Sequence, residues 1–376
     1  MNDTEEGTAP LLAPAAWRTR VKAAGTLAAF LLLVIGWAYT TPPPLPTYGQ
    51  LVAKWRPSES WLYDRHGNLL DSVRVDFHAR RLAWVPLAKI SPALIQTLVQ
   101  SEDRRFFSHG GVDWWAIGSA IRARFDGTRS RGASTLTMQM AAFLAPDLAA
   151  PGARSWRDKI RQMRAAWAIE RNWSKEHILE AYLNLTGFHG EAQGIGAGAL
   201  TLFGKSPEVL TFPDSALMVA LLPSPAANAT IIGARACRIA PKLECNALKQ
   251  AARAMLDERK SLALDPGLAP HLAAKLLKEP GAKVTTTLDV GIQRIALIAL
   301  KRQMMALGRE RARDGAVIVV DNESGDILAY VGGVAGDSTA AFVDGADAPR
   351  QAGSTLKPFL YGQVLEKGYL TPSSIL

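Results

Sequence analysis

The apolar positions of the chain begin with an uncharged run from Ala23 to Tyr39, which has basic residues before it and a proline-rich stretch after it. A helix of about 20 apolar residues crosses the hydrocarbon layer of a membrane. We therefore expect a transmembrane anchor at residues 23–40. Because basic flanks remain in the cytoplasm, residues 1–22 are expected to form a cytoplasmic tail, with the rest of the chain outside. A cleaved signal peptide is the alternative, although this run is longer than the apolar core of most signal peptides.

Further along, apolar residues recur with helical spacing from about Ser91 to Leu222, which predicts a mainly α domain. Residues 233–281 are rich in Ala, Leu and Lys and indicate linker helices. From about residue 282, strand-like runs alternate with an amphipathic helix and surround an Asn-Glu-Ser-Gly-Asp turn. The pattern predicts that a second, α/β domain begins there and occupies residues 282–376.

The composition supports folded domains and narrows the range of partners. With 376 residues, 48% hydrophobic and 20% charged, the chain has the size of about two domains and is neither disordered nor collagen-like. Lys and Arg number 43 against 34 Asp and Glu, and the net charge of +9 favours an anionic partner: nucleic acid, phospholipid head groups or a phosphorylated substrate. The two cysteines, Cys237 and Cys245, cannot build a tetrahedral zinc site and could form one local disulfide or stay as free thiols.

Three polar clusters in the helical domain offer candidate chemistry. Residues 102–113 combine acids, arginines and a histidine, a density that by itself is also typical of a solvated helix end. Residues 132–139 supply hydroxyls, an amide and flexible backbone, which can hold sugar and phosphate oxygens but could equally cap a helix. Residues 154–164 carry a run of cations, several of them on one side of a helix. Such a stripe suits a diphosphate or an anionic membrane surface, with a solvated face as the alternative.

The order and spacing of these clusters resemble the glycosyltransferase family 51 domain of peptidoglycan synthases over residues 58–232. The matching segments are EDRRFFSHGGVD, GASTLTMQ, KIRQ, WSKEHILEAYLN and QGIGAGALTLFGKSPEVLTFPDSALMVALLPSPAAN. Further on, RQAGSTLKPFLYG contains an S-x-x-K motif. With VTTTLD and GAVIVVDNESGDILAYVGG before it, this segment resembles the opening of the transpeptidase domain of a class A penicillin-binding protein of the 1C type. The resemblance implies a mainly α, lysozyme-like glycosyltransferase domain after one transmembrane helix, followed by the start of an α/β transpeptidase domain.

The resemblance also implies an activity. In the family, the 4-hydroxyl of an acceptor GlcNAc attacks C1 of a donor MurNAc in lipid II and releases undecaprenyl pyrophosphate with inversion. Glu102 matches the general base that removes the hydroxyl proton, and Ser354 and Lys357 match the transpeptidase nucleophile and its proton partner. The other matches, with two cations added from the helix stripe, are substrate-binding candidates: Asp103, Phe106, His109, Ser134, Thr135, Gln139, Lys159, Arg161, Gln162 and Arg164.

The sequence departs from the family pattern at three points. Gln162 stands where most members carry a second catalytic glutamate, as is typical of the 1C type, and Ala142 stands where a Lys or Arg usually follows the glutamine of the second motif. The missing cation would weaken the stabilisation of the leaving diphosphate. The chain stops at Leu376, before the S-x-N and K-T-G motifs that acylation also needs, so we expect no transpeptidase activity from it.

The sequence therefore predicts a peptidoglycan glycosyltransferase held in the bacterial inner membrane by a single span, with its catalytic domain in the periplasm. The implied partners are lipid II, the growing glycan strand, the membrane and other cell-wall synthesis proteins, with no place for nucleic acid. A divalent ion, Mg or Mn, near the diphosphate fits the family, but no residue dictates a metal site or a cofactor. A non-catalytic lipid II-binding or scaffold protein is the main alternative. A lysozyme-like hydrolase is disfavoured, because the basic stripe and the anchor suit a lipid diphosphate rather than a soluble glycan.

Overall fold

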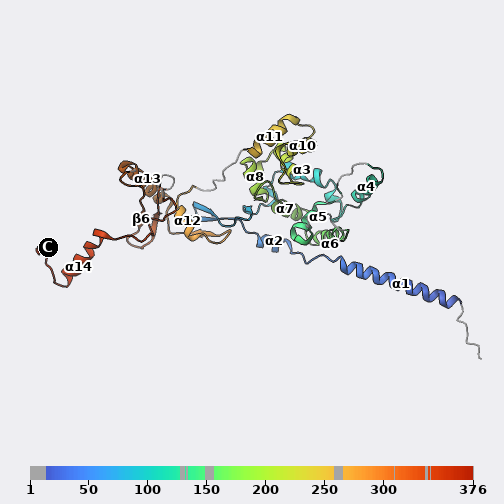
Figure 1. The fold of residues 1–376 in the computed structure, drawn as a ribbon, viewed down its shortest axis with the longest axis horizontal. Helices are drawn as coiled ribbons and strands as arrows, with labels where there is room; N and C mark the ends of the chain where they lie inside the picture. The colour runs from blue at the N-terminus through green and yellow to red at the C-terminus, as the bar shows by residue number, and fades with distance from the viewer. Residues whose placement is uncertain are drawn as a thin grey trace, which may run out of the picture. The chain divides into compact units, whose positions relative to one another are not determined.

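The computed structural model describes residues 14–127, 132, 134–148, 156–257, 266–308, 310–334, 338 and 340–375. The chain divides into two compact units. The first comprises Met1–Pro57 and His78–Leu262, and the second comprises Ser58–Phe77 and Ala263–Leu376. Helices dominate the described residues and the strands are short, which confirms the predicted mainly α class (Figure 1).

The first helix, α1 (Pro14–Tyr39), contains the expected anchor. Its segment Arg20–Tyr39 has a mean hydropathy of 1.9 and is long and apolar enough to cross a membrane. Large apolar side chains along it are exposed, among them Leu32 and Leu33. A continuous apolar surface of this kind is unfavourable in water, so the helix fits a lipid environment.

The rest of the first unit is a helical domain around the core helix α9 (Phe212–Leu221), on which every residue from Asp214 onward is buried. Several of these helices begin where a polar side chain accepts a hydrogen bond from a free backbone N–H group. Ser174, for example, accepts from the His177 N–H at the start of α7, as the sequence predicted. The other elements of this unit are α2 (Tyr48–Lys54), β3 (Arg80–Arg81), η1 (Leu87–Lys89), α3 (Pro92–Glu102), η2 (Phe106–Ser108), α4 (Trp114–Phe125), α5 (Leu136–Leu144), η3 (Pro146–Leu148), α6 (Trp156–Asn172), α7 (Lys175–Leu185), β4 (Ala192–Gln193), α8 (Ile195–Phe203), η4 (Pro207–Val209), α10 (Ala229–Ile239) and α11 (Cys245–Asp257).

The helices α10 and α11, predicted as part of a linker, belong to this domain. Their residues Ile232, Ala236, Leu248 and Ala252 are buried in the same hydrophobic core as α9. In Figure 1 the two helices lie beside α3 and α8. Cys237 and Cys245 form a disulfide between the end of α10 and the start of α11. Of the two alternatives left open by the sequence, a disulfide or two free thiols, the structure therefore shows the disulfide.

The second unit contains two small sheets. In the first, β1 (Glu59–Tyr63) pairs antiparallel with β2 (Leu69–Arg74) and parallel with β5 (Lys283–Thr285). In the second, β6 (Val317–Val320) pairs antiparallel with β7 (Ile327–Val331). The helices of this unit are α12 (Pro270–Leu276), α13 (Val290–Leu307), η5 (Gly353–Leu356) and α14 (Lys357–Glu366).

The pairing of β1 with β5 explains why the structural division differs from the predicted domain boundary at residue 58. Leu62 and Leu70 are fully buried, and they pack with Leu268 and Leu288 from the later part of the chain. Residues 58–77 therefore complete the sheet and core of the second unit. Local periodicity does not reveal such a pairing, because its partner strand is more than two hundred residues away.

Candidate active site

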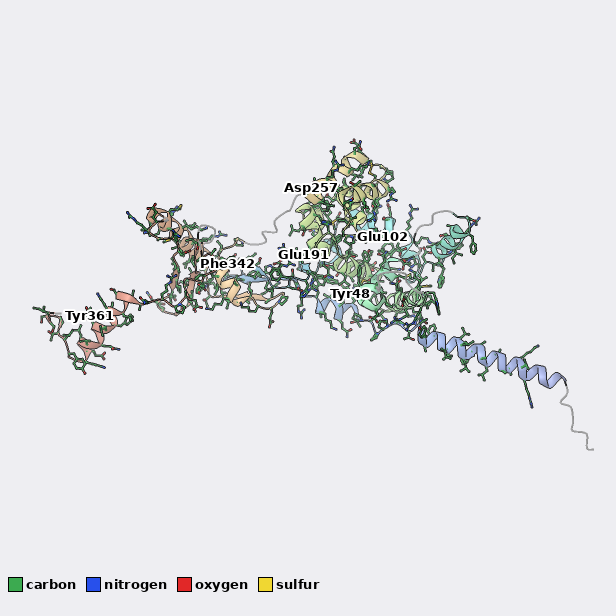
Figure 2. The ribbon with its side chains drawn as sticks, in the orientation of Figure 1. Tyr48, Glu102, Glu191, Asp257, Phe342 and Tyr361 are labelled. Carbon is green, nitrogen blue, oxygen red and sulfur yellow. A yellow bond between two sulfur atoms is a disulfide. The ribbon has the colours of Figure 1, made fainter. Side chains whose placement is uncertain are left out.

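Glu102 is the last residue of α3 and remains half-buried (Figure 2). The Gln139 side chain on α5 donates a hydrogen bond from Nε2 to the Glu102 Oε2, at 3.1 Å. The Tyr182 hydroxyl on α7 donates in turn to the Gln139 Oε1, at 2.9 Å. Burial and the negative charge of Glu102 raise the pKa of Tyr182, which therefore stays a hydroxyl donor at neutral pH. Three helices thus orient one carboxylate.

Asp103, the neighbouring acid, faces into the domain. Its carboxylate accepts from the Leu136 N–H at 3.1 Å, at the start of α5, and lies 3.0 Å from the His109 Nε2. A carboxylate at a helix N-terminus is favourable because the unpaired N–H groups there carry partial positive charge. Phe106 is fully buried below this loop, and the Lys175 Nζ lies 4.2 Å from its ring centre. These contacts hold the segment after Glu102 against α5.

Arg105 and Asp113 close the same loop from its other end. The Arg105 guanidinium hydrogen-bonds the Asp113 carboxylate and holds the pKa of Asp113 below its ordinary value. Asp113 also accepts from the Ala116 N–H at 2.8 Å and so caps α4. Gly111 has φ +94°, and a Cβ there would lie 2.8 Å from the Ala166 carbonyl oxygen. Only glycine fits this close approach to α6.

The second predicted cluster divides into exposed and buried members. The Lys159 Nζ on α6 donates to the Ser134 Oγ at 2.5 Å, and both side chains are half-buried. The Thr135 hydroxyl donates to the Gly111 carbonyl at 2.6 Å and accepts from the Met138 N–H, so it is buried as the cap of α5. Ser134, with Lys159 of the third cluster beside it, is therefore available to a ligand, whereas Thr135 is not.

Gln162 has only 2% of its surface exposed and donates from Nε2 to the Leu148 carbonyl at 2.6 Å. Like Phe106, it is buried within the domain, and the substrate-binding role that the sequence suggested for these two residues stays a prediction. Both side chains satisfy their packing or hydrogen bonding within the core. Ala142 lies on α5, one turn after Gln139, and is half-buried.

The cation stripe on α6 does not converge on Glu102. Arg164 lies 3.8 Å from the Trp37 ring centre and donates to the Thr40 Oγ1 at 2.8 Å. Arg161 lies 3.7 Å from the Asp147 carboxylate. Their contacts thus direct Arg161 and Arg164 toward Asp147 and α1 rather than toward Glu102. Their binding role stays a prediction.

Two pockets of the first unit share Glu102 in their walls. One has a volume of about 420 Å³ and contains Ser134, Asp113 and Trp115 in its lining. The other, of about 800 Å³, lies between α3, α9 and α10 and contains Gln100 and Arg238. A carboxylate at the border of two pockets can take a proton from a molecule in one while a reaction partner occupies the other.

The described residues contain no group of three or more His, Cys, Asp or Glu side chains that could hold a metal ion. Three carboxylates line the smaller pocket, but Asp103 is engaged by the Leu136 N–H and His109, and Asp113 by Arg105, which leaves Glu102 alone where Mg or Mn needs several oxygen ligands. The residues beside Glu102 therefore do not fit a resident metal ion.

In the second unit, Ser354 belongs to η5 and Lys357 begins α14. Both are exposed, as is almost every residue of this helical turn. Within the described part of the chain, neither side chain has a hydrogen-bond partner or ion-pair partner. The S-x-x-K pair is thus present on a helical turn but is not enclosed.

Two residues near the site were missed by sequence reasoning. Tyr182 lies inside the segment WSKEHILEAYLN, but a tyrosine at an apolar helix position is more often simply core. Glu170 accepts from the Thr137 hydroxyl at 2.6 Å and from the Lys175 Nζ at 2.7 Å. No local pattern distinguishes these two roles, because each depends on partners from other helices.

This chain is similar to several known proteins. Residues 66–244 match the family model Transglycosylase. Penicillin-binding protein 1C of Escherichia coli (strain K12) is 34% identical over 308 residues, which cover 78% of this chain and 39% of that protein. Biosynthetic peptidoglycan transglycosylase of Rhodospirillum centenum is 43% identical over 144 residues, 38% of this chain and 60% of that protein. The crystal structure of Penicillin-Binding Protein 1A from Haemophilus influenzae aligns with a TM-score of 0.43 and 17% identity, covering 86% of this chain and 54% of the other.

The chain thus spans 39% and 60% of the length of these two curated relatives. The matched family region contains Glu102, Gln139, Lys159 and Tyr182 and ends close to Cys245. Residues 66–244 thus form a transglycosylase domain, and the chain is similar to class A penicillin-binding proteins that carry a glycosyltransferase family 51 domain, with the 1C type fitting the match to penicillin-binding protein 1C.

Proposed function

We propose that this chain is a peptidoglycan glycosyltransferase that polymerises lipid II into glycan strands and releases undecaprenyl pyrophosphate. The observation that carries the proposal is the position of Glu102, whose carboxylate is held by Gln139 at the border of two pockets. Relatives named as a peptidoglycan transglycosylase and as penicillin-binding protein 1C support the reaction class.

In the proposed reaction, the acceptor sugar lies in the larger pocket and the donor in the smaller one. Glu102 takes the proton of the acceptor 4-hydroxyl while the oxygen forms its bond to the donor C1. The bond from C1 to the phosphate oxygen breaks, and its electron pair leaves with the pyrophosphate. Gln139 keeps the carboxylate aimed through its 3.1 Å hydrogen bond.

The pair Lys159 and Ser134 suits the leaving diphosphate. The Lys159 ammonium lies behind Ser134, and Ser134 lines the smaller pocket. A cation and a hydroxyl placed where negative charge develops stabilise the transition state more than the ground state. This assigns the donor to the smaller pocket and leaves the larger one for the acceptor.

Membrane attachment is supported by the apolar segment Arg20–Tyr39 and by an exposed aromatic surface on α4. Trp115 and Phe125 on this helix are 80% and 85% exposed. Aromatic side chains of this kind favour the interface between lipid and water. A periplasmic position of the domain follows from the basic residues before the apolar segment and is part of the proposal.

A second candidate is a non-catalytic lipid II-binding protein. Gln162 favours it, since a buried amide occupies the position where the family usually has a carboxylate. The two candidates differ in turnover rather than in binding.

The test is incubation of the full chain in detergent with labelled lipid II, followed by separation of the products on a gel. A ladder of long glycans supports the glycosyltransferase. Lipid II that is bound but unchanged supports the binding protein. Shortening of preformed glycan strands, without new polymer, would contradict both.

A further inference from the structure

Two arginines on one side of α6 contact the C-terminal end of α1. The Arg157 guanidinium lies 3.9 Å from the Tyr39 ring centre, and its Nε donates to the Tyr39 carbonyl at 3.2 Å. The Arg164 guanidinium lies 3.8 Å from the Trp37 ring centre and donates to the Thr40 hydroxyl at 2.8 Å. A guanidinium is attracted to the negative face of an aromatic ring. These contacts place two cations at the level where the apolar segment of α1 ends.

The surroundings of the two arginines supply little negative charge. Among the described residues, neither Arg157 nor Arg164 takes part in an ion pair, although Arg161 of the same helix lies 3.7 Å from Asp147. The sequence has no charged residue from Ala23 to Ala53, so the segment around the end of α1 provides no counter-ion. The end of the apolar helix therefore carries a net positive charge that comes from α6.

Both guanidiniums keep hydrogen-bond donors for a further partner. In the part of the chain that the structure describes, the two Nη atoms of Arg157 and the Nε and Nη2 of Arg164 have no hydrogen-bond partner. Burial lowers the pKa of Arg164, because its charged form is incompletely hydrated. An anion that accepts hydrogen bonds from such a cation offsets the cost of its burial. The geometry and the charge thus favour an anionic ligand.

Aromatic side chains indicate where this ligand lies relative to a membrane. Trp37 and Tyr39 remain exposed, and so does Trp156, which precedes Arg157 on α6. Exposed Trp and Tyr at the end of an apolar helix are typical of the boundary between hydrocarbon and head groups. Basic side chains at this boundary are attracted to anionic lipids. The position of the rings therefore favours a lipid head group over a free anion.

The contacts also divide the cation stripe, for which the sequence left a diphosphate and an anionic membrane surface as alternatives. Lys159 donates to Ser134, which lines the smaller pocket. Arg157 and Arg164 instead contact the end of α1. One cation of the stripe thus lies beside the proposed donor pocket, and two lie where the apolar helix ends.

We propose that Arg157 and Arg164, together with Trp37 and Tyr39, form a binding site for the phosphate head group of an anionic phospholipid. The phosphate oxygens accept hydrogen bonds from the remaining N–H groups of the guanidiniums, and the acyl chains lie along the exposed apolar side chains of α1. The inference goes beyond the proposed function and does not depend on it, because this lipid is a bound partner and is not consumed.

The test is native mass spectrometry of the full chain in detergent, with phosphatidylglycerol and phosphatidylcholine of identical acyl chains as probes. Both lipids contain a phosphate, but the choline group cancels its charge. Phosphatidylglycerol should bind to the wild type about tenfold more tightly, as two charge-assisted contacts at a partly exposed site predict. Arg157→Gln and Arg164→Gln should each lower this preference about threefold.

A matched variant separates the position of the charge from its presence. Arg253→Gln removes the same charge from an exposed position on α11, so it should leave the preference unchanged. Circular dichroism checks that each variant is folded. Equal binding of the two lipids by the wild type would overturn the proposal whether or not the variants fold. Full preference in folded Arg157→Gln and Arg164→Gln, or an equal loss in Arg253→Gln, would overturn it as well.

Pyrophosphate, added as its ammonium salt, distinguishes a lipid site from a site for a soluble phosphate. Phosphatidylglycerol that stays bound in an excess of pyrophosphate supports the proposal, because its acyl chains add apolar contacts that a free anion lacks. Displacement of phosphatidylglycerol by pyrophosphate would assign the two arginines to a soluble phosphate and contradict the proposal.

Discussion

Glu102 in the first unit and Ser354 in the second each begin a segment that matches a reaction motif, but their surroundings differ. Glu102 is half-buried and receives a hydrogen bond from Gln139, which Tyr182 supports. Ser354 is exposed, and within the described residues its hydroxyl has no partner. A motif thus provides reactive groups, whereas other elements must orient them and exclude water before they can react.

The two regions also differ in the contacts that fix their backbone. The loop after Glu102 is fixed by Asp103, by the pair Arg105 and Asp113, and by a glycine that contacts α6. None of the residues of α14 is buried. A side chain loses little mobility on such a surface, so a preorganised site is not expected there.

The largest effect should follow Glu102→Gln. The amide keeps the shape of the side chain but cannot accept the acceptor proton, so lipid II polymerisation should fall at least ~10²-fold. Binding of lipid II should stay close to that of the wild type. Near-normal turnover by the folded variant would show that Glu102 is not the base.

A smaller loss is expected for Tyr182→Phe, which removes the hydroxyl that supports Gln139. Losing one hydrogen bond of about 1 kcal/mol should lower kcat roughly fivefold with little change in KM. The control is Tyr48→Phe, because the Tyr48 hydroxyl bonds Glu180 and has no contact with Gln139. If both variants lose the same activity, the effect is general destabilisation rather than loss of orientation.

Ala142→Arg should raise turnover at saturating lipid II about twofold to fivefold. The added cation would lie one turn after Gln139 on α5, where its attraction grows as the diphosphate leaves. Turnover and membrane association are measured in parallel in detergent micelles and on vesicles. Stronger membrane association with an unchanged rate would mean that Lys159 already provides sufficient neutralisation.

Asp113→Asn tests the loop through stability. The pKa of Asp113 lies below its ordinary value of 3.8, so the charged carboxylate stabilises the fold above that pH. This contribution is lost as the pH falls through the lowered pKa. At pH 7 the variant should melt about 2 °C lower than the wild type, and the two melting temperatures should converge below pH 3.8. If the two melting temperatures differ by the same amount at all pH values, the charge of Asp113 is not the cause of the difference.

The smallest effect is expected in the second unit. Ser354→Ala should leave labelling by a fluorescent penicillin at the background level of the wild type, because the exposed serine has no oriented proton acceptor. Polymerisation of lipid II should also be unchanged. Stoichiometric labelling of the wild type that disappears in Ser354→Ala would show that Ser354 is oriented for acylation, contrary to this prediction.

Much of the fold could be predicted from the sequence. The apolar run predicted α1, and the period of apolar residues predicted the helices between Ser91 and Leu222, because both signals are local. The placement of residues 58–77 with the second unit could not be predicted, since β1 pairs with a strand more than two hundred residues later in the chain. The sequence of residues 229–257 also contains no local pattern that distinguishes two packed helices from linker helices.

The candidate site shows the same division. The segment EDRRFFSHGGVD placed Glu102 at a candidate site without any coordinates. Which neighbours would line the site was less predictable: Lys159 contacts Ser134, whereas Arg164 of the same helix contacts Trp37. Helical spacing gives the face of a residue relative to its own helix, but it does not say which element that face will meet.

Composition and local periodicity were enough to predict the anchor and the helical class, whereas the reactive groups were identified through the resemblance of short motifs to a known family. The packing of distant segments was needed to show that Gln139 and Tyr182 orient Glu102, that Gln162 is buried, and that Cys237 and Cys245 form a disulfide. These outcomes depend on contacts between segments far apart in the chain. Their energies are set by packing and by exclusion of water, which no local pattern contains.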